Sequence, residues 1–267
     1  MENGGGMATI VLVHGILGVG SELFPTHALP IRPVVDYFNG VKVHLEKSGI
    51  GVMAPTTPPL QAIEDRGKLL AQSLDSLPAG RVDIIAHSMG GLDARFVLHR
   101  YPDIAQRITS LTTIGTPHRG SAVADMVRSG TNALYDLAPA FLTRQIGALT
   151  DLTTARAQAF NEKTPDAGGV HYMNIAGVAP MNSQQLLLQL AAEIGKLSGA
   201  NDGVVLRSSA LYDKHEHLDD WPVDHFGEIG WASWRGGLSV QASDFYPDQH
   251  LERYNTLLAK IWSLPAR

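Results

Sequence analysis

A serine between small residues is the first feature of this sequence that could do chemistry. Ser88 lies in the run Ala86-His-Ser-Met-Gly-Gly91, directly after the apolar stretch 81–86 and before a segment with helical spacing. A tight turn from a strand into a helix needs small residues two positions before and after its serine, and Ala86 and Gly90 meet this need. The following helix directs its positive N-terminus at the hydroxyl. We therefore predict that Ser88 is a nucleophile rather than a helix N-cap.

A serine nucleophile needs a general base, and the base needs an acid that orients it. On a strand–turn–helix serine the order along the chain is Ser, then Asp or Glu, then His. Asp202 lies in the turn Asn201-Asp-Gly203, before a short apolar run. The alternative is that these residues only form a turn. We predict that Asp202 is the orienting acid.

Four histidines follow Asp202, and one of them is predicted to be the base. His215 and His217 lie in a charged run that we interpret as a solvated loop, and His250 begins the last helix. His225 follows a turn and lies among aromatic residues and glycines that could hold an imidazole while leaving one edge open. We choose His225 as the base instead of a partly buried structural histidine. The adjacent Asp224 is a less favoured acid, because neighbouring side chains seldom converge on one imidazole edge.

An acyl-transfer site also needs backbone N–H groups that stabilise a tetrahedral oxyanion. One is predicted to be the N–H of Met89, the residue after the nucleophile, and the other the N–H of Ile16. Ile16 lies in the loop after the first apolar run, where Gly15 lets the chain bend closely. We expect His14 to hold this loop by hydrogen bonding rather than to act as a base. His118 is expected to fix the loop that follows residues 108–114.

Alternating strand and helix signals predict the elements that position these residues. Residues 8–13 form a short continuous apolar run that indicates a buried strand, and residues 81–86 and 108–114 are predicted to be a second buried strand and a third strand. Helical spacing occupies 60–77 and 90–101 between them. This order predicts a doubly wound, mainly parallel α/β sheet in one domain that spans 1–267. Later strands or strand ends are expected at 171–176 and 203–206, and a closing amphipathic helix at 250–263.

The segment 121–165 is predicted to be a helical cap or lid inserted into this domain. Its helical stretches carry apolar residues on more than one face, although ordinary helices packed on the sheet would give a similar pattern. A second helical insertion is expected at 183–197, where core or cap packing is favoured over a partner site. The apolar residues expected to contact an acyl chain are Leu17, Leu134, Leu137, Phe141, Leu142 and Ile146.

Composition excludes several classes of function for this chain of 267 residues. Lys and Arg number 21 against 26 Asp and Glu, and they are scattered, so nucleic acid is not an expected partner. The absence of cysteine excludes disulfides, thiolate zinc sites and iron–sulfur clusters. We expect no cofactor and no metal. No apolar run approaches the roughly 18 to 20 residues of a membrane span.

The first residues, Met1-Glu-Asn-Gly-Gly-Gly-Met7, carry no basic segment followed by an apolar one. As written, the chain is therefore expected to be cytoplasmic, and extracellular if a signal has been removed. The sequence leaves the oligomeric state open.

Several motifs, taken in order, resemble the bacterial triacylglycerol lipases, which are α/β-hydrolases of the foldase-dependent kind, and their smaller relatives. The motifs are His14-Gly15, Ala86-His-Ser-Met-Gly-Gly-Leu-Asp-Ala-Arg95, Gly115-Thr-Pro-His-Arg-Gly-Ser121, Leu152-Thr-Thr-Ala155 with Asn161, Asn201-Asp202-Gly203 and Asp224-His225. The resemblance implies an α/β-hydrolase fold with a lid. It also implies a carboxylic-ester hydrolase with Ser88, Asp202 and His225 as triad, whose substrate is a lipid or ester, taken up at a lipid–water interface if the lid is mobile.

Three departures limit what the resemblance implies. Ala86 replaces a glycine that these lipases usually have, and the disulfide of their larger secreted members is absent. Those members bind a structural calcium partly through an aspartate two positions after the histidine, where this chain has Gly227. These departures predict a shortened relative that folds without a dedicated chaperone. The open alternatives are a short-chain carboxylesterase, a polyester depolymerase, a thioesterase or an acyltransferase with the same triad, and a non-catalytic binding protein of the same fold.

Overall fold

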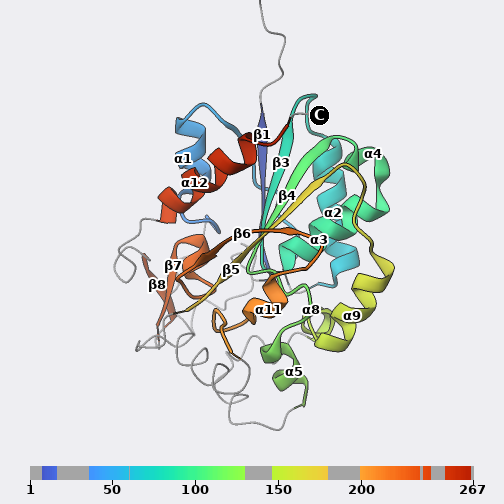
Figure 1. The fold of residues 1–267 in the computed structure, drawn as a ribbon, viewed down its shortest axis with the longest axis vertical. Helices are drawn as coiled ribbons and strands as arrows, with labels where there is room; N and C mark the ends of the chain where they lie inside the picture. Colours follow the sequence, from blue (N-terminus) through green and yellow to red (C-terminus); the bar gives the residue numbers. More distant parts are fainter. Residues whose placement is uncertain are drawn as a thin grey trace, which may run out of the picture.

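A six-stranded parallel sheet forms the centre of the computed structural model (Figure 1). The structure describes residues 8–16, 36–59, 61–129, 146–179, 199–234, 237–241 and 250–265. The sheet has the strand order β2-β1-β3-β4-β5-β6, and every neighbouring pair is parallel. Its strands are β1 (Thr9–Val13), β2 (Gly51–Met53), β3 (Val82–His87), β4 (Ile108–Ile114), β5 (His171–Gly177) and β6 (Glu216–Trp221).

Helices cover both faces of this sheet (Figure 1). On one face, α1 (Val41–Lys47) and α12 (His250–Trp262) pack their apolar residues against the strands in one core cluster. On the other face, α2 (Ile63–Asp75), α3 (Met89–Arg100) and α4 (Pro102–Ala105) contribute to a second cluster. The predicted doubly wound α/β class is confirmed, because parallel strands require crossover connections that place helices on both sides.

The central strands are buried along almost their whole length. All residues of β3 and β4 are buried, and in β1 only Thr9 is partly exposed. A strand that helices cover on both faces has no side that faces solvent, which favours apolar residues along the strand. The predicted strands at 8–13, 81–86, 108–114 and 171–176 and the predicted helices at 60–77, 90–101 and 250–263 therefore match observed elements to within a few residues at each end.

Two predictions about the second half of the sheet are wrong. Residues 203–206 form a turn with an isolated bridge from Asn201 to Leu206, not a strand. The charged run with His215 and His217, interpreted as a solvated loop, instead leads into β6. This strand is at the edge of the sheet and its residues before Trp221 are exposed or half-buried, so it carries charges that conceal the strand signal. His215 is buried beside Asn174 and Asp166.

Smaller elements lie near the carboxyl ends of the parallel strands. The 3-10 turn η1 (Gly227–Ile229) is followed by an antiparallel pair, β7 (Trp231–Trp234) and β8 (Gly237–Gln241). A single helical turn, α11 (Arg207–Ala210), contacts β5. Of the described residues, no helix is long and apolar enough to cross a membrane.

The segment predicted as a cap contains α5 (Ala122–Ser129), α8 (Ile146–Asp151) and α9 (Thr154–Lys163). Leu149 and Leu152 pack with Met89 and Leu92 of α3 in a third core cluster. Leu17, Leu134, Leu137, Phe141 and Leu142 lie outside the described residues, as does the predicted insertion 183–197, and Ile146 begins α8. The lid assignment stays a prediction.

Candidate active site

Ser88 lies at the sharp turn between β3 and α3, in a backbone conformation that non-glycine residues seldom adopt. Its φ of 55° and ψ of −133° are strained for a side chain with a Cβ. The turn is held by its own hydrogen bonds, since Ser88 N donates to the Ile114 carbonyl and its carbonyl accepts from Gly91 N and Thr116 Oγ1. A Cβ at Gly90 would lie 2.6 Å from the His14 carbonyl oxygen, so the close approach of β1 explains the small residue.

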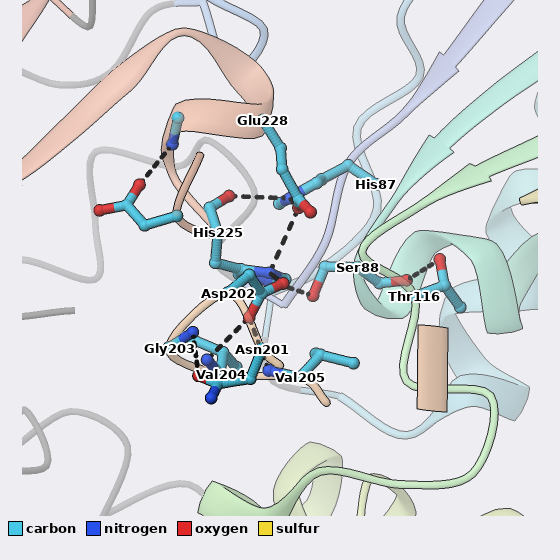
Figure 2. A network of polar contacts seen from close by, with 12 residues as sticks. His87, Ser88, Thr116, Asn201, Asp202, Gly203, Val204, Val205, His225 and Glu228 are labelled. Atoms are coloured by element: carbon cyan, nitrogen blue, oxygen red, sulfur yellow. Dashed lines mark hydrogen bonds and ion pairs between the residues drawn. The ribbon is translucent and has the colours of Figure 1, made fainter. Parts of the chain in front are cut away.

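The three residues predicted as a triad come together in one hydrogen-bonded chain (Figure 2). His225 Nε2 lies 2.9 Å from Ser88 Oγ, and His225 Nδ1 lies 2.8 Å from Asp202 Oδ2. The loops after β3 and β5 and the loop between β6 and η1 place them at the carboxyl ends of the strands. In the neutral form of His225, which can act as a base, Nδ1 donates its proton to the Asp202 carboxylate and the bare Nε2 accepts the Ser88 hydroxyl.

Asp202 is held by the turn in which it lies. Its Oδ1 accepts the N–H groups of Val204 and Val205 at 2.8 and 2.7 Å, and its own carbonyl accepts His225 N. Burial raises the pKa of the Asp202 carboxyl, while the His225 charge and these N–H donors favour the ionised form. The turn that the sequence suggests is therefore real, and it directs the carboxylate at the imidazole.

His225 has two carboxylates beside its ring. Burial lowers its pKa, but the charge and hydrogen bond of Asp202, together with those of Glu228, outweigh burial and raise the pKa of His225 above its ordinary value of 6.5. The carboxylate of Asp224, the less favoured acid, accepts the N–H of Gly227, the first residue of η1, at 2.7 Å. The site thus favours a protonated imidazole, which is the species formed when the base accepts a serine proton.

Of the two predicted oxyanion donors, Ile16 lies on the loop after β1 and Met89 begins α3 directly after Ser88. An added Cβ at Gly15 would lie 2.8 Å from Ser88 Cβ, so the loop after β1 passes directly beside the nucleophile. Ile16 and Met89 pack in one cluster, and within the described part of the chain neither backbone N–H has a hydrogen-bond acceptor. Two unpaired donors beside a nucleophile can bind a developing oxyanion.

His14 fixes the conformation of that loop, as the sequence predicts. Its Nδ1 donates to the Gly15 carbonyl at 2.8 Å, and its Nε2 accepts Thr57 N at 2.9 Å. Burial and the nearby Arg66 charge lower the pKa of His14 to about 4, which keeps this tautomer neutral. Arg66 itself donates to the carbonyls of both His14 and Gly15. Both ring nitrogens of His14 already have hydrogen-bond partners, so His14 is not placed to replace His225 as a base.

His118 and His250 have structural contacts. His118 lies within hydrogen-bond distance of Thr113 and Arg95, and Asn161 donates to its carbonyl, so it links the loop after β4 to α3 and α9. His250 begins α12 and contacts the Asn39 carbonyl. These positions agree with the roles that the sequence suggests for the two histidines.

Sequence reasoning misses two residues of the site, His87 and Glu228. His87 Nε2 lies 2.8 Å from Glu228 Oε2, which in turn lies 3.3 Å from His225 Nδ1 (Figure 2). Both side chains are almost fully buried. A glutamate three positions after the histidine is the one available signal, and in sequence it is indistinguishable from a surface residue of a turn.

The residues at the site do not match a calcium site of the kind the resemblance implies. Gly227 has no side chain, its N–H donates to Asp224, and its carbonyl accepts Arg253 Nη2 at 2.8 Å. His87, His225 and Glu228 bring three metal-ligating atoms within 4.8 Å of one another. These atoms already contact each other at hydrogen-bond distances, so the group is better described as a hydrogen-bond network.

In sequence, the chain is similar to known α/β-hydrolases. The family model described as the alpha/beta hydrolase fold matches residues 56–213. A triacylglycerol lipase of Vibrio cholerae is 30% identical over 259 residues, covering 82% of this chain and 78% of that protein. A triacylglycerol lipase of Burkholderia plantarii is 28% identical over 290 residues, covering 79% and 78%.

Solved structures of similar fold include two lipases. The mature lipase of Bacillus licheniformis superposes with a TM-score of 0.67 at 24% identity, covering 83% of this chain and 86% of that one. The Staphylococcus hyicus lipase has a TM-score of 0.67 at 18% identity and covers 98% of each chain. At these identities the likeness shows a shared fold.

Proposed function

The chain belongs to the bacterial triacylglycerol lipases of the α/β-hydrolase superfamily, and on this premise we propose that it hydrolyses carboxylic esters through an acyl-enzyme on Ser88. The observation that carries the proposal is the continuous chain from Ser88 Oγ through the His225 ring to Asp202, with distances of 2.9 and 2.8 Å. Relatives named triacylglycerol lipase support acylglycerols as the substrate class.

In the first half-reaction His225 Nε2 accepts the Ser88 proton while Ser88 Oγ attacks the ester carbonyl carbon. The carbonyl oxygen becomes an oxyanion and accepts hydrogen bonds from the N–H groups of Ile16 and Met89. As the tetrahedral intermediate collapses, the bond to the alcohol oxygen breaks and His225 donates its proton to the leaving alcohol. The products are the acyl-Ser88 ester and a free alcohol.

In the second half-reaction a water molecule takes the place of the alcohol. His225 accepts one proton from water, and the hydroxide oxygen attacks the acyl carbon. Collapse of this second intermediate returns the proton to Ser88 Oγ and releases the carboxylic acid. Asp202 stays ionised and stabilises the imidazolium in both halves.

The test is hydrolysis of a p-nitrophenyl ester by Ser88→Ala. We expect the rate to fall by several orders of magnitude while the fold, measured by circular dichroism, is unchanged. Ser76→Ala, on the exposed end of α2, is the matched control and should retain full activity. Comparable rates for Ser88→Ala and the wild type would exclude Ser88 as the nucleophile. Labelling by a fluorophosphonate separates the hydrolase from a non-catalytic binding protein of the same fold, because only an activated serine reacts.

A panel of esters of increasing acyl length then resolves the finer question of lipase against short-chain esterase. We propose long-chain acylglycerols at a lipid–water interface, supported by the names of the relatives and by the apolar residues of 128–149. A preference for soluble short-chain esters would identify an esterase with the same chemistry.

A further inference from the structure

Glu228 places a second buried carboxylate beside the proposed general base. Its Oε2 lies 3.3 Å from His225 Nδ1, the same nitrogen that contacts Asp202 at 2.8 Å. The side chain of Glu228 is fully buried, and within the described part of the chain its Oε1 has no hydrogen-bond partner. Burying a charge at such a position is costly unless specific partners stabilise it.

Two glycines make the space that this carboxylate occupies. Gly115, at the end of β4, and Gly177, at the end of β5, both pass so close to the Glu228 carboxylate that a Cβ at either position would overlap it. Gly115 also has a positive φ of 54°, which L-residues with a side chain seldom adopt. The ends of two adjacent central strands are therefore shaped around Glu228, which a surface turn residue would not require.

His87 is the partner that holds the charge of Glu228. Its Nε2 faces two acceptors, Glu228 Oε2 at 2.8 Å and the His225 carbonyl at 3.1 Å, so this nitrogen carries a proton. Its Nδ1 lies 2.7 Å from the Tyr37 hydroxyl. In the neutral ring Nδ1 carries no proton and accepts a hydrogen bond from the Tyr37 hydroxyl. Both ring nitrogens of His87 therefore have hydrogen-bond partners without a positive charge on the ring.

This arrangement keeps the proton of the pair on His87 Nε2 and leaves Glu228 ionised. Burial, the largest effect, and the nearby His225 charge lower the pKa of His87, which favours its neutral form. Burial raises the pKa of Glu228, but hydrogen bonds from His225 and His87 outweigh it and lower the pKa below its ordinary value. A neutral imidazole beside an ionised carboxylate leaves one net negative charge next to His225.

We propose that Tyr37, His87 and Glu228 are positioning residues that hold one ionised carboxylate against the Nδ1 edge of His225, where it adds to Asp202 in stabilising the imidazolium. The inference rests on the proposed function, since it assigns His225 the role of base. None of the three residues touches the reacting atoms, and all act through His225. Tyr37 also borders Gly15, so the same hydroxyl connects this group to the oxyanion loop.

Other titratable and charged groups face Glu228 from the elements packed around it. The Tyr254 hydroxyl of α12 donates to the Glu228 carbonyl at 3.1 Å, and Arg253 of the same helix contacts the Gly227 carbonyl. Asp202 contacts Nδ1 of the His225 ring, and Arg66 lies near Tyr37. Of these groups, Asp202 carries the same negative charge as Glu228. Asp202 therefore continues to stabilise the charged form of His225 when the Glu228 charge is removed.

The principal test is Glu228→Gln, which keeps the size of the side chain and removes its charge. An opposite charge within about 4 Å favours the charged imidazole, so we expect the acid limb of the kcat/KM profile to move down by about one pH unit or more. The plateau rate falls at the same time, by up to about tenfold for each pH unit of that shift, because the imidazolium is less stabilised in the transition state. KM should change much less than kcat. Glu162→Gln, on an exposed face of α9, is the matched control and should leave the limb in place.

Tyr37→Phe tests the hydrogen-bond chain without touching Glu228. Without the hydroxyl donor, His87 loses the partner that keeps Nδ1 bare, and we expect a smaller movement of the acid limb in the same direction. A fall in rate with an unmoved limb in both variants would mean that these residues only support the fold, and would overturn the proposal. An unmoved limb in Tyr37→Phe alone would overturn the roles given to Tyr37 and His87.

A second readout needs no substrate and no intact activity. The protonation midpoint of the His225 ring, followed by NMR in the wild type and in Glu228→Gln, should move down with the charge removed. Ester hydrolysis with an unmoved midpoint would overturn this inference and leave the proposed function intact. A moved midpoint in a protein that hydrolyses no ester would support the positioning group and reject the proposed function.

Discussion

Arg66 Nη2 donates a 2.9 Å hydrogen bond to the carbonyl oxygen of His14, at the first residue of the oxyanion loop. The same guanidinium contacts the Gly15 carbonyl at 3.1 Å and forms a fully buried ion pair with Asp93 of α3 at 2.7 Å. The Gly15 carbonyl and the Ile16 N–H belong to one peptide group, so Arg66 also fixes the orientation of this predicted oxyanion donor. Arg66 thus connects α2 and α3 to the donor geometry of the site.

Arg66→Met should reduce both stability and rate. Removing one partner of a buried ion pair leaves Asp93 uncompensated, which costs about 3 to 5 kcal/mol in the free energy of unfolding. A displaced oxyanion loop should also lower kcat/KM by about 100-fold. Urea unfolding and ester hydrolysis well below the melting temperature measure the two effects.

The double variant Arg66→Met/Asp93→Leu separates these effects. Replacing both partners with apolar residues removes the unpaired charge, so stability should largely return. The rate should stay low, because no group then holds the His14 and Gly15 carbonyls. A rate that recovers together with stability would mean that Arg66 affects activity only through the fold.

Asp202→Asn should lower kcat by up to about four orders of magnitude. An asparagine at this position can donate to Nδ1, which favours the wrong imidazole tautomer, and the substitution removes the nearer of the two carboxylate charges that stabilise the imidazolium. Asp224→Asn is the comparison, because the Asp224 carboxylate accepts the Gly227 N–H at 2.7 Å, whereas Asp202 Oδ2 lies 2.8 Å from His225 Nδ1. The measurement is kcat on a p-nitrophenyl ester for both variants. A larger loss in Asp224→Asn than in Asp202→Asn would show that the acid is wrongly assigned.

The parts of the fold predicted from sequence are those whose signal is local. The apolar run of β1 follows from burial on both faces, and the small residues around Ser88 follow from the crowded turn. The edge strand β6 is missed because one side of it faces solvent and its charges hide the pattern. Residues 203–206, after the turn of Asp202, are misread as a strand because they include a short apolar run.

The site is predicted in part for the same reason. Ser88, Asp202 and His225 each stand in a recognisable turn, and their order along the chain is informative. Glu228 and His87 give no such signal, because their role depends on contacts between β3 and η1, 141 positions apart in sequence. Only the folded chain shows that Gly115 and Gly177 leave space for the Glu228 carboxylate.

The acylation rate of the wild type should rise with pH as His225 loses its proton. A general base must be neutral to accept the serine proton, and the carboxylates of Asp202 and Glu228 raise the pKa of His225 above 6.5. The acid limb of kcat/KM should therefore have an apparent midpoint above 6.5, with low rates below it and a plateau above it. This midpoint belongs to the coupled group rather than to the isolated imidazole. A flat profile from pH 5 to 8 would contradict a histidine base.

The predicted lid leads to a separate prediction for the apolar residues of 128–149. If this segment covers Ser88 in water and turns its apolar face outward at an oil surface, closure and substrate binding use the same side chains. Burying a Leu or Phe against an acyl chain contributes about 1.5 to 3 kcal/mol. Phe141→Ser or Leu142→Ser should then reduce hydrolysis of emulsified long-chain esters much more than hydrolysis of soluble short-chain ones. Val43→Ser, at an exposed apolar residue of α1, is the control and should affect neither. An equal decline on both substrates with a lowered melting temperature would identify the segment as ordinary packed structure and the enzyme as an esterase.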